Sequence, residues 1–154
     1  MCTTLKTRAA LDVASIPTPV KLAAAWTSFM FLYVYVDVLN FYKPHVVAGI
    51  LDGMVWQFEV NPPLLTGMLA SVMVPAVMIV LSVTLPPRAN RIVNVVVASL
   101  YVPYSAFNIA GSTAEWLPFY VLSIGAELAL LVFIVQRAWT SVSRREALVL
   151  RTDR

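Results

Sequence analysis

Two carboxylic acids, Asp37 and Glu127, stand within long apolar stretches of the sequence. An ionisable side chain at the centre of a bilayer costs at least ~2.5–3.5 kcal/mol, so such residues usually face the protein interior and mark a site or a pathway. Glu127 lies near the middle of its apolar stretch, and Asp37 lies near the outer end of its own. We expect the low dielectric to keep Glu127 protonated at pH 7.

Each carboxyl belongs to a set of polar residues at helical spacing. Residues three and four apart share one face of a helix, and polar side chains recur at those steps around both acids and in a third apolar stretch. We interpret these faces as the lining of a polar cavity that opens outward, with Glu127 at its floor. The candidate ligand-binding residues are Tyr33, Asp37, Asn40, Tyr101, Tyr104, Asn108, Tyr120 and Glu127.

A structural role for Glu127 stays open beside the cavity. Pro75 and Pro103 interrupt two apolar stretches at about the depth of Glu127, and a proline frees the carbonyl four residues earlier. The freed carbonyls belong to Ser71 and Ser99, and each needs a hydrogen-bond donor in lipid. A protonated Glu127 is one such donor. A carboxyl that mediates contacts between copies of the chain is a third interpretation.

The residues that usually carry catalysis or metal binding are scarce. The chain has one histidine, His45, and one cysteine, Cys2, which is too few for a zinc site. The common catalytic and phosphate-binding motifs do not occur, so we favour a protein that is not an enzyme and needs no cofactor or metal. A membrane-embedded isomerase with Asp37 and Glu127 as acid and base is less favoured, because helix rise separates their depths by ~8 Å.

Composition indicates which elements position these residues. Of 154 residues, 60% are hydrophobic and only 12% are charged, against about 25% charged in soluble domains. Four apolar stretches approach the ~20 residues that a helix needs to cross a bilayer. We predict a single all-α domain over 1–154, a transmembrane four-helix up-down bundle. Its predicted spans are about 22–42, 64–85, 92–110 and 117–135.

The segments outside the spans receive separate predictions. Apolar residues recur at helical spacing over about 46–58, which predicts an interfacial helix in the first outer loop. It would serve as a lid over the cavity or, in the favoured interpretation, as a connector along the membrane. Residues 136–154 form the predicted cytoplasmic tail. Trp26, Trp116 and Trp139 fall near span ends, where tryptophan prefers the headgroup level.

The basic residues predict the orientation. All of them except Lys43 precede the first span, follow the last span or lie between the second and third spans. The positive-inside rule then places both termini in the cytoplasm, with the chain in the plasma (inner) membrane and its first span as a retained anchor. This distribution accounts for the net charge of +3 and disfavours a nucleic-acid partner. Arg88 and Arg91 are candidates for binding lipid headgroups, and a tight hairpin anchored by Asn90 or Asn94 is the favoured alternative.

Three segments carry a resemblance to known sequences. They are FLYVYVDVLNFYKP at 31–44, LPPRANRIVNVV at 85–96 and GAELALLVFIVQRAW at 125–139. On these segments the chain resembles an uncharacterised bacterial family of small four-helix integral membrane proteins, a domain of unknown function. The resemblance implies a fold and a membrane location and supplies no activity. Because the family pattern has an acidic residue or glycine where this chain has His45, the resemblance gives that histidine no shared role.

We therefore interpret the chain as a multi-pass membrane protein that binds or transports a small amphipathic molecule or a lipid. The alternative is a scaffold or interaction subunit, which includes a homo-oligomer. In that case the small-residue face of the second span, from Gly67 through Ser71 to Ser82, would pair with another helix.

Overall fold

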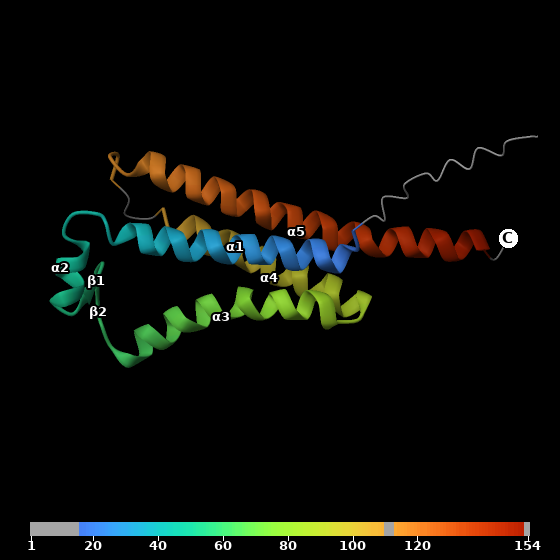
Figure 1. The fold of residues 1–154 in the computed structure, drawn as a ribbon, viewed down its shortest axis with the longest axis horizontal. Coiled ribbons are helices and arrows are strands. Elements are labelled where there is room, and N and C mark those ends of the chain that lie inside the picture. Colours follow the sequence, from blue (N-terminus) through green and yellow to red (C-terminus); the bar gives the residue numbers. More distant parts are fainter. Residues whose placement is uncertain (1–15, 110–112, 153–154) are drawn as a thin grey trace, which may run out of the picture.

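The computed structural model describes residues 16–109 and 113–152, and for 141–152 it describes the backbone alone. The described chain is all-α with one minimal hairpin (Figure 1). Its elements are α1 (Thr18–Asn40), α2 (Val46–Leu51), β1 (Met54–Val55), β2 (Phe58–Glu59), α3 (Pro62–Thr84), α4 (Pro87–Phe107) and α5 (Leu117–Thr152).

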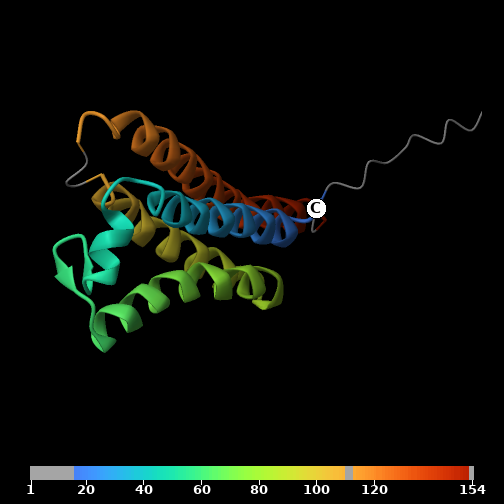
Figure 2. The same ribbon diagram turned by 60° about the vertical axis from the view of Figure 1, so that its left-hand side comes forward.

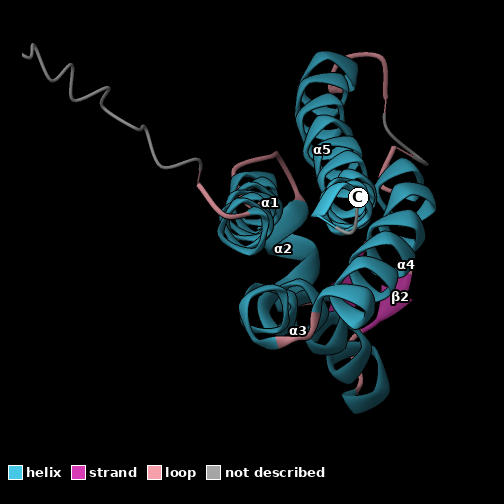
Figure 3. Cartoon of the chain, turned by 90° about the vertical axis from the view of Figure 1, so that its right-hand side faces the viewer, coloured by secondary structure: helices cyan, strands magenta, loops and turns pink. Residues whose placement is uncertain are grey.

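Four long helices run side by side, each opposite in direction to the long helix before it (Figure 1). Helix α1 packs against both α3 and α5, and α4 packs along α5. Helices α3 and α4 touch little, and α3 diverges from α4 towards the end that carries α2 and the hairpin (Figure 2). Seen along the helices, α1, α5, α4 and α3 follow one another around the assembly (Figure 3).

Three of the described helices are long and apolar enough to cross a membrane: α1, α3, and α5 as far as Thr140. Helix α4 covers most of the third predicted span, 92–110, but it starts earlier and ends at Phe107. Because Pro86 and Pro87 fit the first turn of a helix, the helix begins before Arg88 and Arg91 and includes both arginines. The helix therefore has a polar first part, which lowers its apolar content.

The predicted interfacial helix over 46–58 is wrong beyond Leu51. Helix α2 stops there, and Gly53 takes a left-handed conformation with φ +78°, a common way for a helix to end. The following residues form the antiparallel pair of β1 and β2, in which Val55 pairs with Phe58. Apolar residues that fit a helical period also fit a short hairpin here, because a glycine interrupts them and β-branched and aromatic side chains favour strands.

The predicted tail, 136–154, is not a separate segment up to Thr152. Helix α5 continues without a break from Leu117 to Thr152, so its last part extends well past the start of α1 (Figure 1). Residues 153–154 lie outside the described part of the chain.

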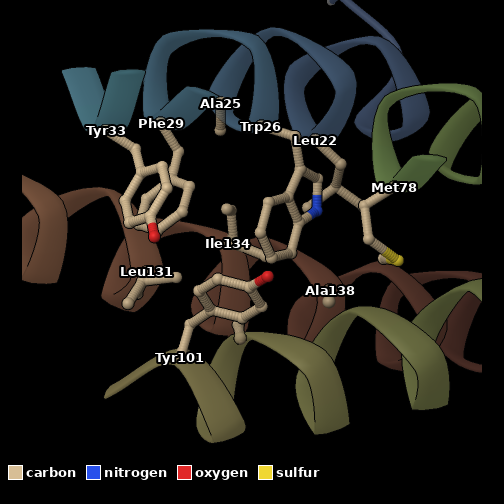
Figure 4. Packing of buried hydrophobic residues seen from close by; sticks show 11 residues of the cluster. Leu22, Ala25, Trp26, Phe29, Tyr33, Met78, Tyr101, Leu131, Ile134 and Ala138 are labelled. Atoms are coloured by element: carbon tan, nitrogen blue, oxygen red, sulfur yellow. The ribbon is translucent and has the colours of Figure 1, made fainter. Parts of the chain in front are cut away.

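The hydrophobic core lies between α1, α4 and α5, with Met78 added from α3 (Figure 4). Trp26 is wholly buried at its centre, so its ring does not lie on the outer surface of the bundle, where contact with headgroups would place it. The ring of Phe29 packs edge-on against that of Tyr101, with ring centroids 5.5 Å apart. Trp139, in contrast, is exposed on α5.

Candidate functional site

A buried carboxyl and a buried hydroxyl meet between α4 and α5. Glu127 is 1% exposed and Ser105 is fully buried, and the hydroxyl is close enough to act on the carboxyl. Glu127 Oε2 and Ser105 Oγ are nevertheless the two buried side-chain polar atoms of the described residues that make no hydrogen bond of good geometry, either with each other or with a third group. Buried polar atoms are rarely left in this state, so the pair has unused hydrogen-bonding capacity.

Asp37 of α1 faces the same region. Its carboxyl interacts electrostatically with both Glu127 and Tyr33, although its side chain is exposed on the isolated chain. The acid of the first long helix therefore lies within electrostatic reach of the acid of the last. We call Asp37, Ser105 and Glu127 the carboxyl site.

Tyrosines adjoin the carboxyl site and join three helices. The hydroxyl oxygens of Tyr33 and Tyr104 lie 2.8 Å apart, and Tyr33 Oη lies 3.4 Å from Ser71 Oγ. Tyr101 Oη donates to the Ser71 carbonyl over 2.6 Å. We call Tyr33, Tyr101 and Tyr104 the tyrosine group.

The hydrogen bond from Tyr101 shows which residue donates to the carbonyl that Pro75 leaves free. Pro75 lies inside α3 and removes the N–H that would otherwise pair with the Ser71 carbonyl. Tyr101, and not Glu127, donates to that carbonyl. Glu127 therefore has no role in compensating the proline of α3.

An aromatic cage surrounds Lys43 at the end of the bundle that carries α2. Lys43 Nζ donates to Tyr120 Oη over 2.7 Å, and Tyr120 Oη donates to Asn40 Oδ1 over 3.3 Å. The ammonium lies 4.0 Å from the ring centroid of Tyr120, 4.8 Å from that of Phe119 and 5.0 Å from that of Trp116. We call these four residues, Lys43, Trp116, Phe119 and Tyr120, the Lys43 cage.

The Lys43 cage was not predicted from the sequence, in which Lys43 indicated only orientation. The available signal was the aromatic segment at 116–120, at the start of the last span, opposite a lysine that follows the first span. Cations are attracted to such ring faces.

The predicted site residues do not all share one environment. Tyr33, Tyr101 and Glu127 are buried, whereas Asn40 and Tyr120 are half-buried in the bond chain beside Lys43. Asp37 and Tyr104 are exposed at the edge of the site, and Asn108 is exposed at the end of α4. The structure thus brings Asp37, Glu127 and the tyrosine group into one region and leaves Asn108 at its margin.

A second polar cluster anchors the opposite end of the bundle. Trp26 Nε1 donates to Asn94 Oδ1 over 2.7 Å, and Asn94 Nδ2 donates to Asn90 Oδ1 over 2.6 Å. Asn90 Nδ2 donates in turn to the Ser82 carbonyl over 2.8 Å. These bonds tie the turn between α3 and α4 to α1, which confirms a tightly anchored hairpin.

No group of three or more His, Cys, Asp or Glu side chains in the described part of the chain could hold a metal ion. The carboxyl site offers carboxylate and hydroxyl oxygens to a ligand, beside aromatic ring faces. This set suits a cation or a hydrogen-bond donor on an otherwise apolar molecule.

Comparison with protein families gives a match to a family of unknown function (DUF6326). The family model matches residues 19–145, from the start of α1 into the second half of α5. No curated protein and no solved structure matches the chain.

Proposed function

The chain belongs to the DUF6326 family of unknown function, and we propose that it is a multi-pass membrane protein that binds a small amphipathic cation at the carboxyl site. Three apolar helices are compatible with a membrane protein. The proposal adds α4 as a fourth span, and the binding activity rests on the unsatisfied pair of Glu127 and Ser105.

The distribution of side chains on α4 supports its place as a span. Its buried face carries polar side chains, among them Asn90, Asn94 and Ser105. Its outer face exposes large apolar side chains, including Ile92 at 62% and Leu100 at 65%. A helix of a water-soluble protein shows the reverse pattern. Contact with lipid would explain an apolar outer face around a polar interior.

Charge supports the proposed orientation. Arg88 and Arg91 lie at the start of α4, at the same end of the bundle as the start of α1, whereas Lys43 lies at the opposite end (Figure 1). We place the arginine end in the cytoplasm, since basic residues favour that side of a membrane. The Lys43 cage then faces outward, and the carboxyl site lies deeper, between the cage and the core.

The unsatisfied atoms of Glu127 and Ser105 define the class of ligand. An isolated buried carboxyl oxygen without a partner costs about 1–3 kcal/mol. A cationic or N–H group of a ligand would remove this cost, and the rings of the tyrosine group would cover its apolar part. A membrane-soluble cation has both properties.

The test uses the full-length protein in detergent and tetraphenylphosphonium, a lipophilic cation, as the probe in titration calorimetry. We expect affinity to rise with pH, because protons compete with the cation for the carboxyls. Glu127→Gln should abolish most of the binding and its pH dependence. Glu115→Gln, which alters an exposed glutamate outside the site, is the matched control. Equal binding by the Glu127→Gln protein and the unmodified protein would overturn the proposal.

A scaffold role has one observation in its favour. Helix α3 buries only Pro75, Met78 and Ser82, and it barely contacts α4. Its remaining surface is apolar, with Leu69 65% exposed, and a second copy or another membrane helix would cover it. Light scattering of the protein in detergent distinguishes the two functions, because a monomer that binds the cation favours the ligand-binding role.

A further inference from the structure

A shallow apolar groove lies between α4 and α5, away from the carboxyl site. It is lined by Arg91, Ile92, Val95 and Val96 of α4 and by Trp139 of α5, and its volume is about 160 Å³. A groove of this size fits a segment of one hydrocarbon chain and is too small for a whole lipid.

Arg91 lines this groove and supplies its positive charge. The guanidinium carbon of Arg91 lies 4.0 Å from the ring centroid of Trp139. A guanidinium placed over an indole keeps the N–H donors at its edge for other partners. That edge can bind two oxygens of a phosphate at once.

The surroundings indicate where the occupant comes from. Ile92 and Val96 are 62% and 50% exposed beside the groove, and Trp139 is 56% exposed. Arg88 lies one helical turn before Arg91 and is exposed. Apolar side chains, a tryptophan and two arginines therefore follow one another along this surface, in the order expected from a bilayer interior to its headgroups.

We propose that this groove binds an anionic phospholipid, with an acyl segment against Val95 and Val96 and the phosphate on Arg91. The proposal rests on the membrane location proposed above, and it is independent of ligand binding at the carboxyl site. Arg88 supplies a second positive charge near the same headgroup.

Native mass spectrometry of the full-length protein in detergent tests the proposal. The probes are phosphatidylglycerol and phosphatidylcholine with identical acyl chains, added in equal amounts. We expect phosphatidylglycerol to be retained about fivefold more, because a basic residue near a headgroup contributes about 1 kcal/mol. Arg91→Gln should lower the ratio several-fold and leave only the contribution of Arg88, and Arg91→Lys should restore part of the loss.

Two further variants distinguish lipid binding at this groove from non-specific attraction of anionic lipid to basic residues on the surface. Arg137→Gln removes an arginine that stacks on Phe133 of α5 and does not line the groove, and it should leave the ratio unchanged. Val96→Trp fills the groove from its exposed side and should lower retention of both lipids. An unchanged ratio in Arg91→Gln, or an equal loss in Arg137→Gln, would overturn the proposal.

Two more measurements complete the test. One distinguishes a lipid phosphate from free phosphate, and the other distinguishes a failure of the lipid proposal from a failure of the proposed cation binding. An excess of inorganic phosphate should not displace phosphatidylglycerol, and displacement would indicate a free-anion site and contradict a lipid site. Glu127→Gln should keep the lipid ratio, and Arg91→Gln should keep tetraphenylphosphonium binding. If the protein were recovered from cells outside the membrane fraction, the lipid proposal would fail with the membrane location on which it rests.

Discussion

Lys43 Nζ lies 2.7 Å from Tyr120 Oη, a hydrogen bond between residues 77 positions apart in the sequence. The bond connects the turn after α1 to the first turn of α5, and the rings of Trp116 and Phe119 complete the surroundings of the ammonium. The end of the bundle beside the carboxyl site is thus closed by one cation and three aromatic rings.

The first prediction concerns the stability of this closure. Lys43→Gln should lower the free energy of unfolding in detergent by about 1–2 kcal/mol, because it removes a cation from three ring faces. Tyr120→Phe keeps the ring and removes only the hydroxyl, so its cost should be smaller, about 0.5–1.5 kcal/mol. Lys21→Gln, a half-buried lysine near the start of α1, is the control. The cage is not stabilising if thermal unfolding of the Lys43 and Lys21 variants coincides.

The second prediction concerns Asn94, which is wholly buried. Its Oδ1 accepts hydrogen bonds from Trp26 Nε1 and Ser82 Oγ, at 2.7 Å and 3.2 Å. Asn94→Ala should destabilise the protein by about 2–4 kcal/mol, because it leaves the buried Trp26 Nε1 without an acceptor and removes the bonds that Asn94 Nδ2 donates to Asn90. Asn108→Ala, at an exposed asparagine of the same helix, should change stability by less than about 0.5 kcal/mol. Similar unfolding temperatures for the two variants would show that the buried network does not hold the hairpin.

The third prediction tests the partnership of Tyr101 with Pro75. Tyr101→Phe removes the donor to the Ser71 carbonyl and should cost about 1–3 kcal/mol. Pro75→Ala restores an N–H that can bond to this carbonyl within α3. In that background, Tyr101→Phe should cost about 1 kcal/mol less, which a double-mutant cycle measures.

The matched cycle uses Tyr104→Phe, since the Tyr104 hydroxyl bonds to Tyr33 and does not contact the Ser71 carbonyl. Pro75→Ala should leave the cost of that substitution unchanged. An additive result for Tyr101 and Pro75 would mean that the tyrosine does not compensate the proline.

The helical class and the approximate positions of the long helices were predictable from the sequence, because apolar stretches bounded by prolines leave few alternatives. The segment after Leu51 was not, since its apolar residues fit both a helix and a hairpin. Left-handed conformations at His45 (φ 66°) and Trp56 (φ 54°) frame this segment. Histidine indicates positive φ only weakly and tryptophan does not indicate it, whereas glycine does, as at Gly53.

The hydrogen-bond partners of side chains were harder to predict than the helix face on which each residue lies. The spacing of Tyr33, Asp37 and Asn40 identified one face of α1, and Glu127 was expected inside the bundle. Which residue donates to the Ser71 carbonyl depends on the rotation of α4 against α3, which no single-helix pattern contains. Trp26 was misplaced for the same reason, because its partner Asn94 lies 68 residues away.

The last prediction separates two of the three roles that the sequence left open for Glu127, hydrogen bonding within the bundle and ligand binding. If Glu127 stabilises the bundle as a hydrogen-bond donor, Glu127→Leu should destabilise it. We expect the opposite, a gain of about 1–2 kcal/mol, because the substitution removes a buried oxygen that has no partner and keeps an apolar side chain in its place. Binding of tetraphenylphosphonium should be lost in the same variant, and thermal unfolding together with calorimetry measures both effects.

The matched control lies one turn away on the same helix. Ser123 is buried like Glu127, but its hydroxyl donates to the Tyr120 carbonyl over 3.1 Å. Ser123→Ala removes a satisfied group and should lower stability by about 0.5–1.5 kcal/mol without abolishing cation binding. If Glu127→Leu makes the protein more stable but unable to bind the cation, then Glu127 serves binding and not stability. Destabilisation by Glu127→Leu would instead assign the carboxyl to the architecture of the bundle.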